Sequence, residues 1–277
     1  MTVPLVVAIG TMHGKEVAIA PPLARLGIAA LVPIGLDTDA FGTFTREVAR
    51  TGSMLDAARQ KARAACKLTG LDVGIGSEGS FGPRPDIPLL PLGREVIVFW
   101  ERTTGREIVE QVVDEQPAFL GRRVANIDDL DALIARTDFP ATSLVVSPVG
   151  DDIHAKGLRT LSKVIDTTRW AIAKSQEGLA LVQTDMRANH NPRRMRTICL
   201  AAEALAKRLS THCPRCGSYG WGLVGVERGL PCSICGTPTG LVSLECHGCT
   251  ACEYAVSSVR SDGIVSADAA NCPNCNP

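Results

Sequence analysis

Short apolar runs alternate with helix-like segments along the first part of the chain. Aliphatic runs bounded by turn residues predict buried strands at 3–9, 29–34, 72–77 and 143–146. Helical periodicity predicts helices from the turn at 10–15 to about 26, and over 53–68, 127–135, 158–179 and 193–209. The segments 95–101 and 107–113 predict a hairpin. This order indicates an α/β domain built on a mixed sheet.

The helix expected over 53–68 has clear boundaries and one closely packing face. Ser53 can cap its first turn, and Gly70 can end it in the left-handed conformation. Its alanines recur at helical spacing on one face: Ala57, Ala58, Ala62 and Ala65. We therefore expect this helix to lie close against a sheet.

The composition is that of a folded protein whose net charge creates no strong electrostatic field. Of the 277 residues, 45% are hydrophobic and 21% are charged, and the formal net charge is zero. No apolar run reaches the roughly 18 residues that a membrane span needs, and the run near the N-terminus is too short for a secretion signal. We expect a soluble cytoplasmic protein with no membrane segment, in which thiols stay reduced.

Cysteine usage divides the chain. Only Cys66 and Cys199 fall in the first 212 residues, whereas the other nine cysteines lie from Cys213 onward. We place the boundary near Ser210–His212. This predicts an α/β domain over 1–211 and a small zinc-ribbon domain over 212–277.

Four C-x-x-C pairs make the second domain a metal-binding candidate. They are Cys213 and Cys216, Cys232 and Cys235, Cys249 and Cys252, and Cys272 and Cys275. Two such pairs complete one tetrahedral four-thiolate site, so the pattern predicts two structural zinc ions. An iron–sulfur cluster is the alternative. Cys246 is interpreted as a spare cysteine and His247 as a solvent-facing side chain.

The pairing of these motifs is open on sequence grounds. Sequential pairing makes two stacked zinc ribbons, and cross-brace pairing makes one interleaved module. We favour sequential pairing because 219–229 fits a ribbon hairpin between the first two motifs. Closed four-thiolate sites lack the open coordination position of catalytic zinc, so this domain is expected to be structural or to recognise a partner.

Charge argues against nucleic acid as the favoured partner of the cysteine-rich domain. From Cys213 onward the chain has three arginines, no lysine and five acidic residues. Phosphate backbones are bound by clustered cations, which this segment lacks. The sequence leaves the oligomeric state open, a homodimer included.

The turn after the first strand has the residues of a phosphate-binding loop. Thr11, His13, Gly14 and Lys15 lie between a strand and a helix, where backbone amides, a hydroxyl and an ammonium group can surround an anion. The loop matches neither the Walker nor the Rossmann glycine pattern, and an ordinary strand-to-helix turn is the alternative.

Two acidic segments are candidates for magnesium binding or proton transfer. Glu78 stands in a glycine-rich run with Gly79 and Ser80, where glycines let the backbone approach a ligand. The long loop 35–52 holds Asp37 and Asp39, two carboxylates that could share a metal. A tight turn with a solvated glutamate and simple turn capping are the respective alternatives.

A basic turn follows near residue 187. Arg187 and Arg193 flank a segment whose Pro192 predicts a helix start. Guanidinium groups in such a turn suit a phosphate or carboxylate ligand. A solvated basic helix face is the alternative.

The segment 53–80 resembles the purine nucleoside triphosphatases related to inosine triphosphate pyrophosphatase and the Maf proteins. The resemblance rests on AARQKA at 57–62, on DVGIGSEG at 72–79, and on Thr11 and Lys15, which precede them in that family's order. It implies a largely parallel sheet flanked by helices. The chain also resembles an uncharacterised bacterial family known only as a domain of unknown function, through Asp37–Asp39, GSEGSFGP at 76–83, Thr184–Arg187 and the cysteine tail.

Two functional hypotheses follow. In the first, the protein is a Mg²⁺-dependent hydrolase of a nucleotide phosphoanhydride. Lys15 and Thr11 would hold phosphates, and Glu78 with Asp37 or Asp39 would hold Mg²⁺. In the second, the first domain senses a nucleotide or another anion, and the zinc domain contacts a protein or RNA partner. The hydrolase requires Lys15 and Glu78 to line one pocket.

Overall fold

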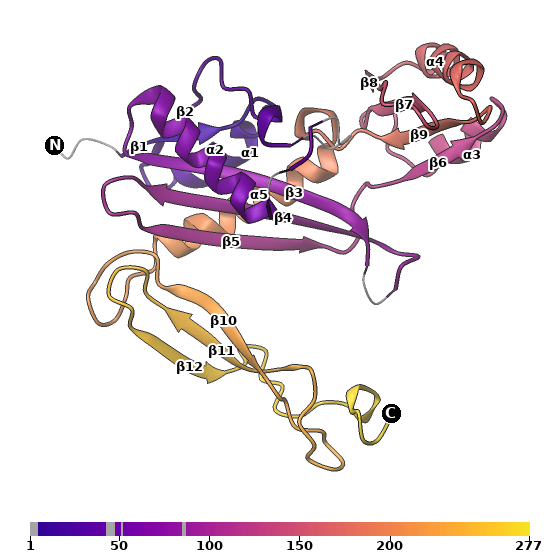
Figure 1. Ribbon diagram of the computed structural model, residues 1–277. Coiled ribbons are helices and arrows are strands. Elements are labelled where there is room, and N and C mark those ends of the chain that lie inside the picture. The colour runs from indigo at the N-terminus through magenta and orange to yellow at the C-terminus, as the bar shows by residue number, and fades with distance from the viewer. Residues whose placement is uncertain (1–4, 43–47, 51, 85–86) are drawn as a thin grey trace. The chain divides into compact units, whose positions relative to one another are not determined.

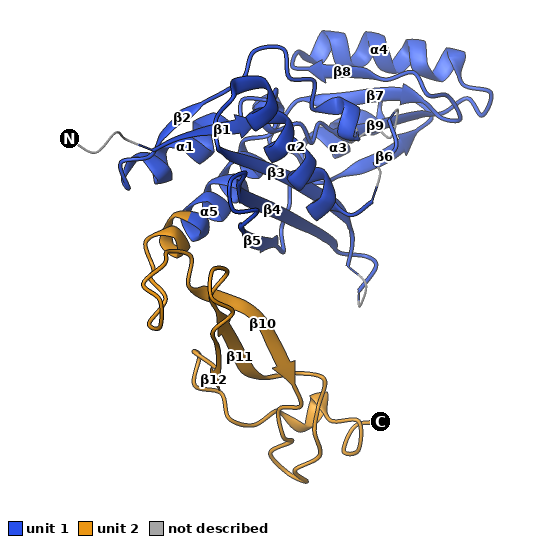
Figure 2. Ribbon diagram, turned by 60° about the vertical axis from the view of Figure 1, so that its left-hand side comes forward, with its two compact units in different colours: residues 1–205 blue, residues 206–277 orange. Residues whose placement is uncertain are grey.

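A computed structural model describes residues 5–42, 48–50, 52–84 and 87–277 (Figure 1). The chain forms two compact units, Met1–Leu205 and Ala206–Pro277 (Figure 2), which are described separately below. Residues 3–4 of the first expected strand, and 43–47 and 51 of the long loop, lie outside the described residues.

The first sheet of the first unit has the order β2-β1-β3-β4-β5. Its strands are β1 (Val6–Gly10), β2 (Ala29–Leu31), β3 (Val73–Pro83), β4 (Pro91–Glu101) and β5 (Glu107–Asp114). β1 pairs in parallel with β2 and β3, whereas β3–β4 and β4–β5 are antiparallel. The hairpin predicted around residue 104 is the β4–β5 pair.

Two helices connect the parallel strands: α1 (Glu16–Ala24) lies between β1 and β2, and α2 (Met54–Thr69) precedes β3. Ser53 caps α2 through a reciprocal capping box with Asp56, and Gly70 ends it with φ 75°. The predicted alanine face is confirmed, since its four alanines are fully buried. Figure 1 shows α2 lying along the sheet.

Glycines on the strands set how closely α2 approaches the sheet. A Cβ on Gly74 would lie 2.2 Å from the carbonyl oxygen of Ala62, and one on Gly76 would lie 1.9 Å from that of Ala58. Gly10 on β1 faces the carbonyl oxygen of Lys61 in the same way, at 2.4 Å. These glycines therefore admit a helix backbone, whereas the sequence had led us to expect that the glycines near Glu78 admit a ligand.

A second sheet in the same unit has the order β6-β9-β7-β8 and is antiparallel throughout. Its strands are β6 (Gly121–Val124), β7 (Leu144–Pro148), β8 (Ala155–Leu158) and β9 (Ala180–Thr184). The helices α3 (Asp129–Ile134) and α4 (Leu161–Lys174) accompany this sheet, and residues from both pack with it in one apolar core. Of these strands only β7 was predicted, because β6 and β8 have just four residues each and β9 directly follows the helix expected over 158–179.

The expectation of a largely parallel sheet is wrong. Among the described strand pairs only β1–β2 and β1–β3 are parallel. A parallel pair needs a long crossover, which α1 and α2 supply, whereas the other strands follow one another through short connections or pair antiparallel. The helix α2 and the glycines of β3 fit the resemblance to the purine nucleoside triphosphatases, but the strand topology does not.

The last helix of the first unit, α5 (Pro192–Leu209), runs into the second unit, whose sheet has the antiparallel order β10-β11-β12. These strands are β10 (Gly222–Arg228), β11 (Val242–Gly248) and β12 (Ala255–Val259). Short 3-10 helices occur at Asp39–Phe41, Ala188–His190 and Ala269–Asn271. In the described part of the chain, no helix is both long and apolar enough to span a membrane.

Candidate functional site

A pocket of about 450 Å³ in the first unit is lined by residues from both of its sheets. Most of the residues singled out from the sequence meet there: Thr11, His13, Lys15, Asp39, Glu78, Gly79, Ser80 and Arg187. Gly14, Asp37 and Arg193 do not line it. Residues more than 170 positions apart therefore converge on one cavity.

The turn between β1 and α1 is organised by the hydroxyl of Thr11. Thr11 Oγ1 accepts hydrogen bonds from the backbone N–H groups of His13, at 3.2 Å, and Lys15, at 3.4 Å. Lys15 occupies the position directly before α1, and its side chain makes no capping hydrogen bond. The turn thus presents Lys15 and the first turn of a helix at the pocket, where the helix dipole favours negative charge.

Lys15 is a buried cation whose hydrogen-bond partners are neutral. Its side chain donates to the backbone oxygen of Ser77, at 3.0 Å, and to Ser77 Oγ, at 3.1 Å, and the residue is 5% exposed. Burial, together with the nearby charge of Arg194, lowers the pKa of Lys15 to about 7. An anion bound at this point would stabilise the charged amine.

Glu78 lies in the same pocket, between two cations. Its carboxylate accepts from the ammonium group of Lys61 and, at 2.9 Å, from the guanidinium of Arg50. Burial alone would raise the pKa of Glu78, but the charges of Lys61 and Lys15 outweigh it and hold the pKa at about 2. Both oxygens of this carboxylate are therefore occupied by cationic partners.

Gly79 is required by a buried ion pair beside the pocket. Arg194 on α5 donates from Nε to Glu95 Oε1 on β4, at 2.5 Å, and also to the backbone oxygen of Met186. A Cβ on Gly79 would lie 2.3 Å from Glu95 Oε1 and 2.6 Å from an Arg194 nitrogen. The Arg194 guanidinium carbon also lies over the ring of Phe81, 5.1 Å from its centroid, which adds a cation–π contact to these partners.

A histidine–aspartate pair also belongs to the pocket. His13 Nε2 lies 3.1 Å from Asp39 Oδ1. Burial lowers the pKa of His13, and the neighbouring carboxylate of Asp39 only partly opposes this. Asp37 accepts a hydrogen bond from the backbone N–H of Asp39, at 2.9 Å, which is the turn-capping role weighed above.

The basic turn after β9 contributes to the pocket through Arg187. Arg187 binds the carboxylate of Asp185 through its side chain and its backbone N–H, and Asp185 is only 1% exposed. Arg193 instead pairs with Asp138, with Nε and Oδ2 2.6 Å apart. Of the two arginines singled out from the sequence, only Arg187 is therefore placed to meet a ligand of this pocket.

The pocket is predominantly cationic. Six basic side chains line it, and three carboxylates accompany them: Lys15, Arg50, Lys61, Lys156, Arg187 and Arg194, with Asp39, Glu78 and Asp185. Four of these basic residues were not predicted from the sequence to belong to the site: Arg50, Lys61, Lys156 and Arg194. Lys61 had a visible signal, because it falls on the alanine face of α2 and is buried there. Arg50 comes from a loop and Lys156 from β8, a strand that the pattern did not predict, whereas Arg194 lies on the predicted helix α5.

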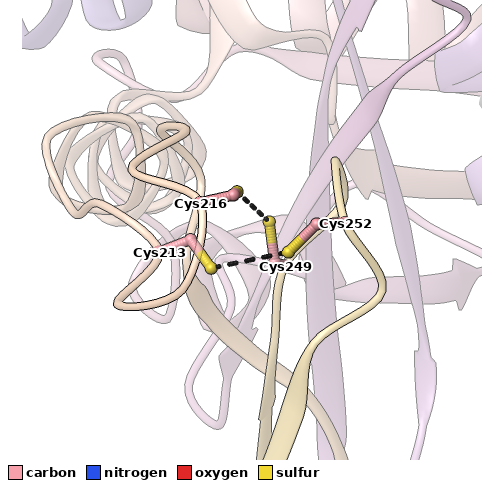
Figure 3. Close-up of side chains that lie close together, drawn as sticks. All are labelled: Cys213, Cys216, Cys249 and Cys252. Carbon is pink, nitrogen blue, oxygen red and sulfur yellow. Dashed lines mark hydrogen bonds between the residues drawn. The ribbon is translucent and has the colours of Figure 1, made fainter.

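The second unit brings the eight paired cysteines into two clusters. Cys213, Cys216, Cys249 and Cys252 form one (Figure 3), and Cys232, Cys235, Cys272 and Cys275 form the other. Sulfur–sulfur distances are 3.7 and 3.8 Å in the first cluster and 3.4 to 3.9 Å in the second. A tetrahedron with Zn–S bonds of 2.3 Å has sulfurs roughly 3.8 Å apart, whereas a disulfide requires about 2.05 Å. Both clusters fit structural zinc.

The preference for sequential pairing of the motifs is wrong, since each cluster joins the first motif to the third or the second to the fourth. β10 and β11 are antiparallel, with Gly222 opposite Gly248, so the motif before β10 lies beside the motif after β11. β12 turns back along β11 and returns the chain to the second motif. The seven residues of β10 span roughly 23 Å, which keeps the first and second motifs apart. The segment 219–229, predicted to form a ribbon hairpin, instead contains the single strand β10.

Backbone amides support the sulfurs in a repeated pattern. The first cysteine of every motif accepts an N–H from the residue two positions later, at 3.3 to 3.5 Å: Arg215, Ile234, Ala251 and Asn274. Such bonds stabilise thiolates as metal ligands. Cys246 and His247 on β11 belong to neither cluster. In the described residues, no carboxylate or histidine group of three or more converges in this way.

Comparison with known proteins identifies the family but not an activity. A domain of unknown function (DUF6671) matches residues 61–277, which include Lys61, Glu78, Arg187 and all eight clustered cysteines. A search of curated proteins and a search of solved structures give no match. Neither finding supports the resemblance to inosine triphosphate pyrophosphatase and the Maf proteins. The matched region covers more than half of the chain, which therefore belongs to the DUF6671 family.

Proposed function

We propose that the pocket of the first unit binds the phosphate groups of a small molecule. The observation that carries the proposal is Lys15, a buried ammonium group without a carboxylate among its hydrogen-bond partners, at the start of a helix and among other cations. A buried charge is costly unless it is paired, and a phosphate oxygen would supply the missing partner.

Thermal stability in the presence of tripolyphosphate tests this proposal. A ligand that binds only the folded protein stabilises it by about 2.7 kcal/mol at one hundred times its Kd. Lys15→Met should abolish this stabilisation, because it removes the cation and keeps an apolar stem of similar length. Lys67→Met, on the exposed side of α2, is the matched control and should retain it. Equal stabilisation of the wild type and Lys15→Met would refute the proposal.

Hydrolysis of a nucleotide phosphoanhydride is the second candidate function, and the presence of Lys15 and Glu78 in one pocket favours it. Mg²⁺ is commonly held by one or two carboxylates together with substrate phosphates. Glu78 would have to exchange Lys61 or Arg50 for the ion, and Asp37 lies outside the pocket lining. The residues present therefore do not form a ready magnesium site, and any ion would enter with the phosphates.

Release of phosphate or pyrophosphate from a panel of nucleoside triphosphates with Mg²⁺ tests the second candidate. Glu78→Gln should abolish turnover while leaving phosphate-dependent stabilisation in place. Equal rates for the wild type and Glu78→Gln would remove Glu78 from the mechanism. If nucleotides stabilise the protein but are not hydrolysed, only the binding function remains supported.

The cysteine clusters support a separate structural role for the second unit. Each has four thiolates around one position, which leaves no coordination site for a substrate. We propose that zinc holds this unit folded and that the unit contacts a protein or RNA partner. Loss of partner binding on zinc removal, with tripolyphosphate binding retained by the first unit, is the expected result.

A further inference from the structure

The second sheet of the first unit has one face in its apolar core and another at the pocket. Leu144 and Val146 of β7, with Val182 of β9, belong to the core cluster that includes residues of α3 and α4. Side chains alternate along a strand, so Val145, Leu181 and Gln183 lie on the opposite face. The strand register places Val145 directly beside Gln183.

These three side chains line the pocket and carry no charge. β9 and β7 are the two central strands of the sheet, so this wall of the pocket is backed by the core. Phe119 lines the same pocket, and its ring centroid is 6.4 Å from that of Phe81. The wall formed by Val145, Leu181, Gln183 and Phe119, called the neutral wall below, differs in chemistry from the cationic turn at Lys15.

Gln183 is half-buried, and a glycine stands opposite it. Gly121 on β6 pairs with Gln183 across the strands, and a Cβ at Gly121 would approach the Cβ of Gln183 to 3.3 Å. The absence of a side chain there leaves room beside the amide. A glutamine amide offers both donors and an acceptor, so it can bind the edge of a heterocycle that presents both.

We infer that the neutral wall binds the nucleobase of a nucleotide whose phosphates lie at Lys15. The inference rests on the proposed phosphate-binding function. Aliphatic and aromatic side chains suit the faces of a planar ring, the Gln183 amide suits its edge, and the cations suit the phosphates. The pocket volume of about 450 Å³ lies within the usual range for a small-molecule site.

The Arg194–Phe81–Phe119 row connects the two parts of this pocket. Arg194 stacks on Phe81, which in turn packs near Phe119. Phe81 therefore links Arg194, which would contact the phosphates, to Phe119, which would contact the base. A nucleotide uses both parts, whereas a simple polyphosphate uses only the cationic part.

Titration calorimetry in magnesium-free buffer, with tripolyphosphate and with each of ATP, GTP, CTP and UTP, tests the inference. The wild type should bind at least one nucleotide roughly tenfold more tightly than tripolyphosphate. Gln183→Ala and Gln183→Leu should remove most of this preference without changing tripolyphosphate affinity, which also shows that the variants are folded. Gln111→Ala, on the exposed side of β5, should keep the preference.

The outcomes separate the two proposals. Tripolyphosphate binding without preference for any nucleotide would overturn the neutral wall as a base site and leave phosphate binding intact. A nucleotide preference that survives both Gln183 variants would likewise overturn it. Failure of tripolyphosphate and of all four nucleotides to bind would overturn the proposed function and this inference with it.

Discussion

Paired cysteine-to-serine substitutions distinguish cross-brace from sequential zinc binding. Cys213 and Cys249 belong to the same cluster, whereas Cys213 and Cys232 belong to different clusters. The double variant Cys213→Ser with Cys249→Ser damages one cluster and should retain one zinc ion. The double variant Cys213→Ser with Cys232→Ser damages both and should retain none. Cys246→Ser, outside the clusters, should retain two.

The size of the effect follows from sharing the binding free energy among four ligands. A structural zinc site contributes roughly 10–16 kcal/mol, so one thiolate accounts for about 3 kcal/mol. Loss of one ligand should weaken a site about 100-fold, and loss of two about 10⁴-fold. These differences in zinc affinity are large enough for a competing chelator to remove zinc from damaged sites and leave it in intact ones.

Zinc content after dialysis against such a chelator, measured by elemental mass spectrometry, gives the readout. Sequential pairing predicts the reverse pattern, because Cys213 and Cys232 would then share one ion. One zinc in the Cys213/Cys232 variant and none in the Cys213/Cys249 variant would refute the strand-register argument. Both double variants carry two substitutions of the same kind, so nonspecific destabilisation should affect them equally.

Three further predictions follow from individual residues. Because the pKa of Lys15 is about 7, its amine loses its charge as the pH rises above that value. The affinity for sulfate should therefore fall roughly tenfold per pH unit above about pH 7 and stay constant below it. A sulfate affinity, measured by calorimetry, that does not change between about pH 6 and 9 would contradict this. Gly79→Ala should lower the free energy of unfolding by about 1–3 kcal/mol in chemical denaturation, since its Cβ would collide with the ion pair at Glu95, whereas Gly82→Ala meets open space and should cost little. Glu253, with φ 57°, holds the left-handed position that Gly217 and Gly236 hold after the first two motifs; Glu253→Gly should raise the melting temperature of the zinc-bound second unit by relieving about 1 kcal/mol of strain, and a lowered one would count against this.

The sequence by itself determined the features that depend on local chemistry. The boundaries of α2 follow from the capping residue Ser53 and the terminal Gly70, and its buried face follows from alanine spacing. The eight clustered cysteines were identified by their two-residue spacing, because one tight turn is enough to bring each pair of sulfurs together. Lys15 was identified by its position after the first strand, and Glu78, which lies within β3, was identified by the glycines around it.

The tertiary structure decided everything that depends on how distant segments pair. Motif spacing is the same for both cysteine pairings, and only the antiparallel register of β10, β11 and β12 selects one of them. Glycines at 74 and 76 are compatible with a ligand or a helix, and the packing of α2 assigns them to the helix. The sequence pattern did not reveal β6, β8 or β9, since the stability of these strands depends on neighbours far away in the chain. β9 supplies Leu181 and Gln183 of the neutral wall and β8 supplies Lys156, so this side of the pocket became visible only in three dimensions.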